Sequence, residues 1–160
     1  MEITSHLSFD ASCDAVAQML TDPQFYQFVG DHLNATSVAA TPVDDGLTAS
    51  MIVPAPEGTG KWIGAHLNLT ETVIWGPASG DGSRNGRMAL TLSGFPATMD
   101  GPIKLEPTNQ GCSMDYNAEF TVRIPLIGKK VENMAGDSMT RLVHASETLG
   151  NSWLAQKMIN

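Results

Sequence analysis

The sequence has few basic residues, few cysteines and no long apolar run. The 160 residues include only 9 Lys and Arg but 17 Asp and Glu, which gives a formal net charge of -8. Nucleic acids and anionic membrane surfaces attract clustered positive charge, so this balance argues against both as partners. No stretch approaches the roughly 20 apolar residues that a membrane-spanning helix needs. A membrane span is therefore not expected.

The cysteines and the N-terminal sequence bear on the cellular compartment. The opening residues, MEITSHLSFD, lack the basic start and apolar core of a signal peptide. Cys13 and Cys112 are the only cysteines and lie far apart in the sequence. Two distant cysteines in a chain without an export signal are predicted to be free core thiols. The expected location is therefore the cytoplasm.

No motif for catalysis, metal binding or phosphate binding is present. The four histidines show no metal-ligand spacing and are predicted to be solvated surface residues: His6, His32, His66 and His144. The segment Gly58–Lys61 lacks the Ser or Thr that follows the lysine of a phosphate-binding loop. We therefore predict no catalytic residue, no metal site and no cofactor.

Alternation of polar and apolar residues dominates most of the chain. It predicts a strand at 2–9, after which Asp10 or Ser12 caps one short helix and Asp22 caps a second, with Pro23 in its first turn. Further strands are predicted near 35–41, 47–53, 65–75, 86–93, 98–106 and 112–124. Such strict alternation is typical of an antiparallel sheet with one dry face and one wet face.

The pattern changes after Pro125. Apolar residues then recur at helical spacing and predict a long helix over about 129–153, with Gly150 ending or kinking it. A long amphipathic helix has to bury its apolar stripe, and the dry face of the sheet is the available surface. The sequence therefore predicts one α+β domain over 1–160, in which a curved seven-stranded antiparallel sheet wraps around the C-terminal helix.

Three segments carry a resemblance to a known superfamily. They are SHLSFDASCDAVAQMLTDPQF, VPAPEGTGKWIGAHLNLTETVIW and FTVRIPLIGKKVE. The chain resembles the START-like (SRPBCC, Bet v 1-like) superfamily, whose fold is the helix-grip. Within it, the chain looks like an uncharacterised actinobacterial branch with a Pro-Leu-hydrophobic-Gly turn before the last helix, here 125–128. The resemblance implies a cavity for a hydrophobic ligand but no particular reaction, because members include carriers, receptors, cyclases and oxygenase subunits.

Glu71 is the one charged residue on a predicted dry face. A carboxylate there costs several kcal/mol unless it is paired or protonated. One alternative is a bulge or rim position that returns Glu71 to solvent. The other is a polar group that faces the cavity. Arg87 and Arg123 are possible partners, although the alternation places Arg123 on the wet face.

The irregular segment 54–64 is a candidate functional loop. Trp62 and Ile63 lie between Gly60 and Gly64, which is typical of a lid over a pocket mouth, although the pair also suits a plug in the core. The methionines of the dry faces fit an adaptable cavity or an ordinary core equally well. The predicted ligand-binding residues are Glu71, Trp62, Met51, Leu69, Met88, Leu90, Met114, Tyr116, Phe120, Met139 and Leu142.

Three functions are compatible with these features. The leading one is binding or transport of a small hydrophobic molecule, lipid or polyketide-like, between the sheet and the C-terminal helix. The alternatives are a cyclase or dehydratase that uses Glu71 as acid or base, and an interaction module whose core is closed. The volume and lining of the space between sheet and helix distinguish the three.

Overall fold

The structure is a computed structural model that describes residues 1–159. Strands and helices follow one another in the expected order, with one additional helical turn, α3, in the irregular segment. The elements are β1 (Glu2–Phe9), α1 (Cys13–Met19), α2 (Pro23–His32), β2 (Ser37–Val43), β3 (Gly46–Pro54), α3 (Gly60–Ile63), β4 (His66–Trp75), β5 (Arg84–Leu92), β6 (Ala97–Pro107), β7 (Cys112–Val122) and α4 (Gly128–Ile159).

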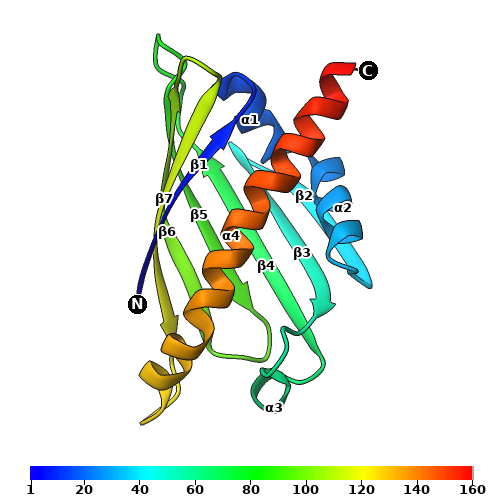
Figure 1. The fold of residues 1–160 in the computed structure, drawn as a ribbon, viewed down its shortest axis with the longest axis vertical. Coiled ribbons are helices and arrows are strands. Elements are labelled where there is room, and N and C mark those ends of the chain that lie inside the picture. The colour runs from blue at the N-terminus through cyan, green and yellow to red at the C-terminus, as the bar shows by residue number, and fades with distance from the viewer. Residues whose placement is uncertain (160) are drawn as a thin grey trace.

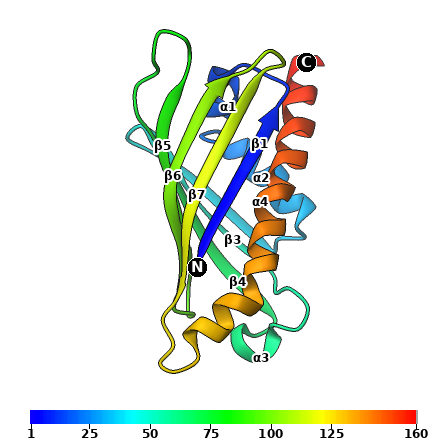
Figure 2. The same ribbon diagram turned by 60° about the vertical axis from the view of Figure 1, so that its left-hand side comes forward.

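The strands form a seven-stranded antiparallel sheet in the order β1-β7-β6-β5-β4-β3-β2. The sheet curves, and α4 crosses its inner face diagonally (Figure 1). Helices α1 and α2 connect the two outer strands and lie beside the C-terminal half of α4, whereas α3 lies at the opposite end (Figure 2). The predicted α+β helix-grip fold is confirmed.

The residue alternation explains which face of the sheet receives the helix. In β1 every second residue is buried, and β7 buries its apolar positions in the same way. Met139 and Val143 of α4 are 8% and 7% exposed and belong to the same core. Full burial of such a side chain stabilises the fold by about 1.5–3 kcal/mol. The apolar stripe of α4 therefore docks on the dry face, as the change of period indicates.

Helix α4 has 32 residues and continues beyond the predicted end at 153. Gly150 does not end it. A Cβ atom there would lie 2.7 Å from the Phe9 ring and 3.1 Å from the Met19 methyl group, so glycine allows the helix to approach both side chains. Across residues 1–159, no helix, α4 included, has the length and apolar character that crossing a membrane requires.

Polar contacts fix the ends of the other helices and the outer strand. Ser12 is the N-cap of α1, and Asp22 accepts the backbone N–H of Gln24 at 2.9 Å to cap α2, with Pro23 at its first position. The side chain of Glu147 in α4 accepts the Ser8 N–H of β1 at 2.8 Å. Strand β1 is an edge strand, and this bond satisfies part of its open edge.

The two cysteines contradict the prediction of free thiols. Cys13 and Cys112 form a disulfide, with their Cα atoms 5.1 Å apart. The register of β1 and β7 places Phe9 opposite Cys112, and Cys13 begins α1 four residues later. The bond therefore ties the start of α1 to the start of β7. Disulfides are uncommon in reducing compartments, so the cysteines no longer support a cytoplasmic location.

Candidate functional site

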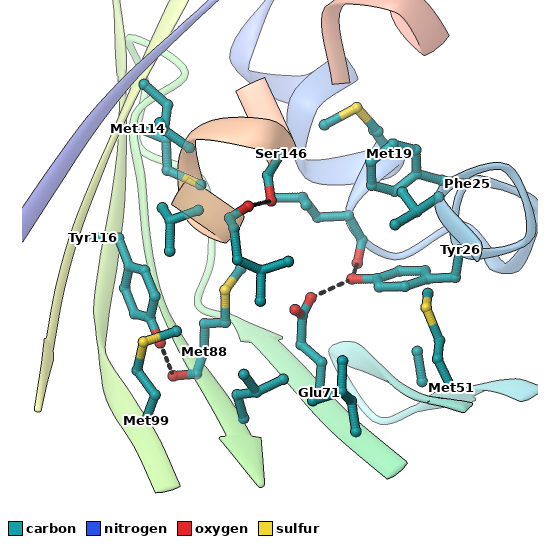
Figure 3. Close-up of a pocket in the computed structure, with 18 of the residues that line it drawn as sticks. Met19, Phe25, Tyr26, Met51, Glu71, Met88, Met99, Met114, Tyr116 and Ser146 are labelled. Atoms are coloured by element: carbon teal, nitrogen blue, oxygen red, sulfur yellow. Dashed lines mark hydrogen bonds between the residues drawn. The ribbon is translucent and has the colours of Figure 1, made fainter. Parts of the chain in front are cut away.

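A cavity of about 100 Å³ lies between the sheet, α2 and the middle of α4 (Figure 3). Apart from Glu71, Tyr26, Tyr116 and Ser146, every side chain of its wall is apolar. The remaining residues of the wall are Leu7, Phe9, Met19, Leu20, Phe25, Val29, Leu33, Ala49, Met51, Leu69, Met88, Leu90, Met99, Met114, Leu142 and Val143. A concave apolar site with a few polar groups is the usual form of a small-molecule site.

Glu71 lies in the wall of this cavity. Strand β4 pairs without interruption on both sides, with Glu71 opposite Ala49 of β3 and opposite Leu90 of β5. No bulge turns the side chain towards solvent. The side chain of Glu71, a half-buried residue, points from β4 towards Tyr26 of α2 and lines the cavity (Figure 3). The structure thus has the second of the two alternatives, a polar group that faces the cavity.

The partner of Glu71 is Tyr26 of α2, which the sequence did not indicate. The Tyr26 hydroxyl lies 2.9 Å from Glu71 Oε1 and 3.0 Å from the carbonyl oxygen of Leu20. The proposed arginine partners are elsewhere. Arg87 forms an exposed ion pair with Asp100 at 2.9 Å, and Arg123 is exposed. The prediction of Arg87 or Arg123 as partner is therefore wrong.

Burial controls the protonation of these groups. Removal from water raises the pKa of Glu71, and the hydrogen bond that Tyr26 can donate to the ionised carboxylate offsets only part of that rise. Burial, followed by the nearby Glu71 carboxyl, raises the pKa of Tyr26 well above its usual value. The same two causes raise the pKa of Tyr116, so both phenols stay neutral at physiological pH. No Lys, Arg or His belongs to the cavity wall to stabilise a carboxylate.

The predicted site residues separate into two groups. Glu71 shares the first cavity with seven of them: Met51, Leu69, Met88, Leu90, Met114, Tyr116 and Leu142. Trp62, Phe120 and Met139 instead line a second cavity of about 200 Å³ near α3 and the start of α4. Trp62 is 37% exposed and lines this second cavity together with Ile63. It is therefore not a lid over the cavity that contains Glu71.

A narrow gap of about 10 Å³ lies between the two cavities. It shares Leu90 and Met99 with the first cavity, and Leu92, Ala97, Phe120 and Met139 with the second. These six side chains form the partition between the cavities. Two of the six are methionines, whose flexible side chains fill irregular space without fixing its shape.

Several residues of the first cavity were missing from the predicted site. Helices α1 and α2 and the cap between them supply Met19, Leu20, Phe25 and Tyr26. On these helices, residues that pack against the sheet and residues that line a cavity show the same apolar sequence pattern. Ser146 of α4 contributes a hydroxyl, which donates to the Leu142 carbonyl at 3.2 Å. An aromatic residue with a polar end on a buried helix face was the one signal that could have identified Tyr26.

The possible metal ligands are the His, Cys, Asp and Glu side chains of the described residues 1–159. All four histidines are exposed, as predicted. Within residues 1–159, no three His, Cys, Asp or Glu side chains are grouped as a metal site requires.

The sequence matches, over residues 4–154, the family described as "Protein of unknown function (DUF2505)". The chain belongs to this family. It is also 26% identical over 94 residues to an uncharacterised protein of Mycobacterium tuberculosis strain H37Rv, across 58% of this chain and 53% of that protein. The chain thus spans about half the length of the curated relatives that it matches. The mycobacterial relatives agree with the actinobacterial branch that the sequence resembles.

Solved structures show the same fold at low sequence identity. A START superfamily protein from Mycobacterium smegmatis aligns with a TM-score of 0.56 and 13% identity, over 97% of each chain. Ara h 8.0201 aligns with a TM-score of 0.60 and 7% identity, over 98% of each chain. This DUF2505 protein therefore has the START-like, Bet v 1-like fold that the three sequence segments resemble.

Proposed function

We propose that this DUF2505 protein binds a small hydrophobic molecule in the cavity between the sheet and α4. One observation carries the proposal: the core is not closed. The helix and the sheet leave a space of about 100 Å³ whose wall is apolar except for four polar side chains. A closed interaction module would fill this space with side chains, because protein interiors normally pack densely.

The lining also favours a ligand of variable shape. Five methionines, Met19, Met51, Met88, Met99 and Met114, line the cavity, and unbranched thioethers change conformation at low cost. The second cavity near Trp62 adds space beyond the partition. A lipid or polyketide-like molecule longer than the first cavity would fit if the side chains of the partition moved. With a net charge of -8, a nucleic acid is not expected as a partner.

A filled-cavity variant tests the proposal. Ala49 is 2% exposed and lines the cavity, so Ala49→Leu places extra carbon atoms inside it. Ala89 lies on β5, two strands away from Ala49 in the sheet, and its alternation with Met88 and Leu90 of the cavity wall places it on the opposite face, so Ala89→Leu is the matched control. We expect fluorobenzene, followed by ¹⁹F NMR, to bind the wild type and the control with the same affinity and Ala49→Leu at least tenfold more weakly. Equal binding by all three proteins would place the probe outside this cavity.

Catalysis is a second candidate function, because Glu71 is a carboxyl of the cavity wall whose pKa is raised by removal from water. Such a group can donate or accept a proton in a cyclase or dehydratase reaction. Native mass spectrometry of the protein purified from its host identifies any ligand that it retains. Incubation of that ligand with wild type and with Glu71→Gln then distinguishes the two functions. Conversion by the wild type alone supports catalysis, and an unchanged ligand in both samples supports binding.

A further inference from the structure

Two hydroxyl groups of the first cavity already donate hydrogen bonds to backbone carbonyls. Tyr116 donates to the Met88 carbonyl at 3.1 Å, and Ser146 donates to the Leu142 carbonyl at 3.2 Å. Each hydroxyl carries a single proton, so neither has another to offer. Their lone pairs remain free to accept a hydrogen bond from a ligand.

Tyr26 has two neighbours for one proton. Its hydroxyl is 3.0 Å from the Leu20 carbonyl oxygen and 2.9 Å from Glu71 Oε1. Leu20 is buried at the C-cap of α1, and a carbonyl oxygen can only accept. Leaving this buried carbonyl unpaired would cost roughly 1–3 kcal/mol. The Tyr26 hydroxyl is placed to donate to either oxygen. With its proton on the Leu20 carbonyl, the hydrogen bond to Glu71 runs from the carboxyl group to the Tyr26 oxygen.

Glu71 can donate only if it carries a proton. Its surroundings favour that state, because the cavity wall contains no Lys, Arg or His and its other titratable side chains are the phenols of Tyr26 and Tyr116. The order of donation is then Glu71 to Tyr26 to the Leu20 carbonyl. One carboxyl oxygen is used as the donor, and the other keeps the free lone pairs of a neutral acid.

We propose that the first cavity recognises a neutral apolar molecule through a hydroxyl or N–H group that donates to the free carboxyl oxygen of Glu71. This inference rests on the proposed binding function and adds the class of ligand to it. All three hydroxyl protons are committed, so every polar group of the wall meets the ligand as an acceptor. Anionic molecules such as fatty acid carboxylates are excluded, because the cavity supplies neither a cation nor a free donor.

Four fluorinated single-ring probes of similar size test this recognition by ¹⁹F NMR: 4-fluorophenol, 4-fluoroanisole, 4-fluorobenzoate and 4-fluorobenzylamine. The phenol has a donor, and the methyl ether lacks it. We expect the wild type to bind the phenol at least tenfold more tightly than the ether, and to bind neither the benzoate nor the amine measurably. Benzoate binding, or a cationic amine that binds more tightly than the phenol, would overturn the proposal.

Two variants of Glu71 separate the role of its proton from that of its shape. In Glu71→Gln the amide N–H₂ donates to Tyr26 and the amide oxygen accepts from the ligand, as a protonated Glu71 does. This variant should keep the preference for the phenol within about twofold. Glu71→Leu introduces an apolar side chain of similar size that has no acceptor, and the preference for the phenol should fall at least tenfold. Loss of the preference in Glu71→Gln would show that a carboxylate is required and would overturn the proposal.

Direct observation of the proton makes the test independent of binding. The ¹³Cδ chemical shift of Glu71 should be that of a protonated carboxyl at pH 7, and a carboxylate shift would overturn the inference. Failure of the proposed function is distinguishable: neither the phenol nor the ether would then bind the wild type. If both bind equally well, the cavity is a hydrophobic site without recognition of a donor, and the inference alone fails.

Discussion

Reduction of the Cys13–Cys112 disulfide should destabilise the fold strongly. The two cysteines are separated by 99 positions in the sequence. Opening a loop of this length returns conformational freedom to the unfolded chain, which corresponds to about 4.7 kcal/mol at 25 °C in the loop-entropy treatment. Each kcal/mol shifts the melting temperature of a domain of this size by roughly 2–4 °C. The expected decrease in Tm is therefore roughly 9–19 °C.

The assay compares the same sequence in two redox states. Both sulfurs are buried, with Cys13 5% and Cys112 1% exposed, so the protein should be reduced while unfolded and then refolded with reductant present. Urea unfolding followed by tryptophan fluorescence gives the free energy of unfolding of each form. The variant Cys13→Ala/Cys112→Ala is the control, because reductant should leave its midpoint unchanged.

Two results would contradict this prediction. Alkylation of both cysteines in unfolded, unreduced protein would show that no disulfide is present. A disulfide whose reduction costs less than about 1 kcal/mol would contradict the loop-entropy argument instead. The bond also affects the cavity, because α1 carries Met19 and is capped by Leu20, and β7 carries Met114 and Tyr116. A reduced protein that still folds should therefore bind fluorobenzene more weakly.

The fold was predictable because its signals are local. Alternation in 2–9 and 112–124 gives the strands, and the change to helical spacing after Pro125 gives α4. The ends were less accurate: β7 ends at Val122 rather than at 124, and α4 continues to Ile159. The predicted end or kink at Gly150 was based on the low helix propensity of glycine, which is a local property. Glycine is needed there because Phe9 and Met19 approach the helix closely, which is a tertiary property.

The disulfide was not predictable from spacing. Its formation depends on the pairing of β1 with β7, which joins the first strand of the chain to the last. Once Phe9 lies opposite Cys112, Cys13 is brought close by the turn into α1. The sequence distance between the cysteines says nothing about this pairing.

The candidate site was predictable only in part. The phase of Glu71 marks it as unusual, because strand alternation fixes the direction of a side chain. Its partner Tyr26 depends on how α2 docks beside α4, where Trp153 packs against Phe25 and Phe28 with ring centroids 5.8 and 5.6 Å apart. The division into two cavities depends on how the side chains of the partition pack. Neither property has a local signal in the sequence.

Three substitutions test the packing and the carboxyl. Met139→Asp buries a charge without a partner and should lower the free energy of unfolding by roughly 3 kcal/mol or more. The control Met158→Asp, at a position 76% exposed, should change it by less than about 0.5 kcal/mol. Equal urea midpoints for the two variants would show that α4 does not dock by this face. Gly150→Ala should destabilise by about 1–3 kcal/mol despite the better helix propensity of alanine, because the new methyl group meets Phe9; a higher Tm would mean that the ring moves freely. For Glu71→Gln, urea unfolding from pH 4 to 8 is decisive, because the folded pKa of Glu71 is raised above its ordinary value of 4.5. The stability of the wild type should fall relative to the variant as the pH rises above 4.5, by at most about 1.4 kcal/mol per pH unit, and the difference should stop growing above the folded pKa. A difference that stays constant over this range would mean that Glu71 titrates as an exposed glutamate does, and that the cavity holds a carboxylate rather than a neutral acid.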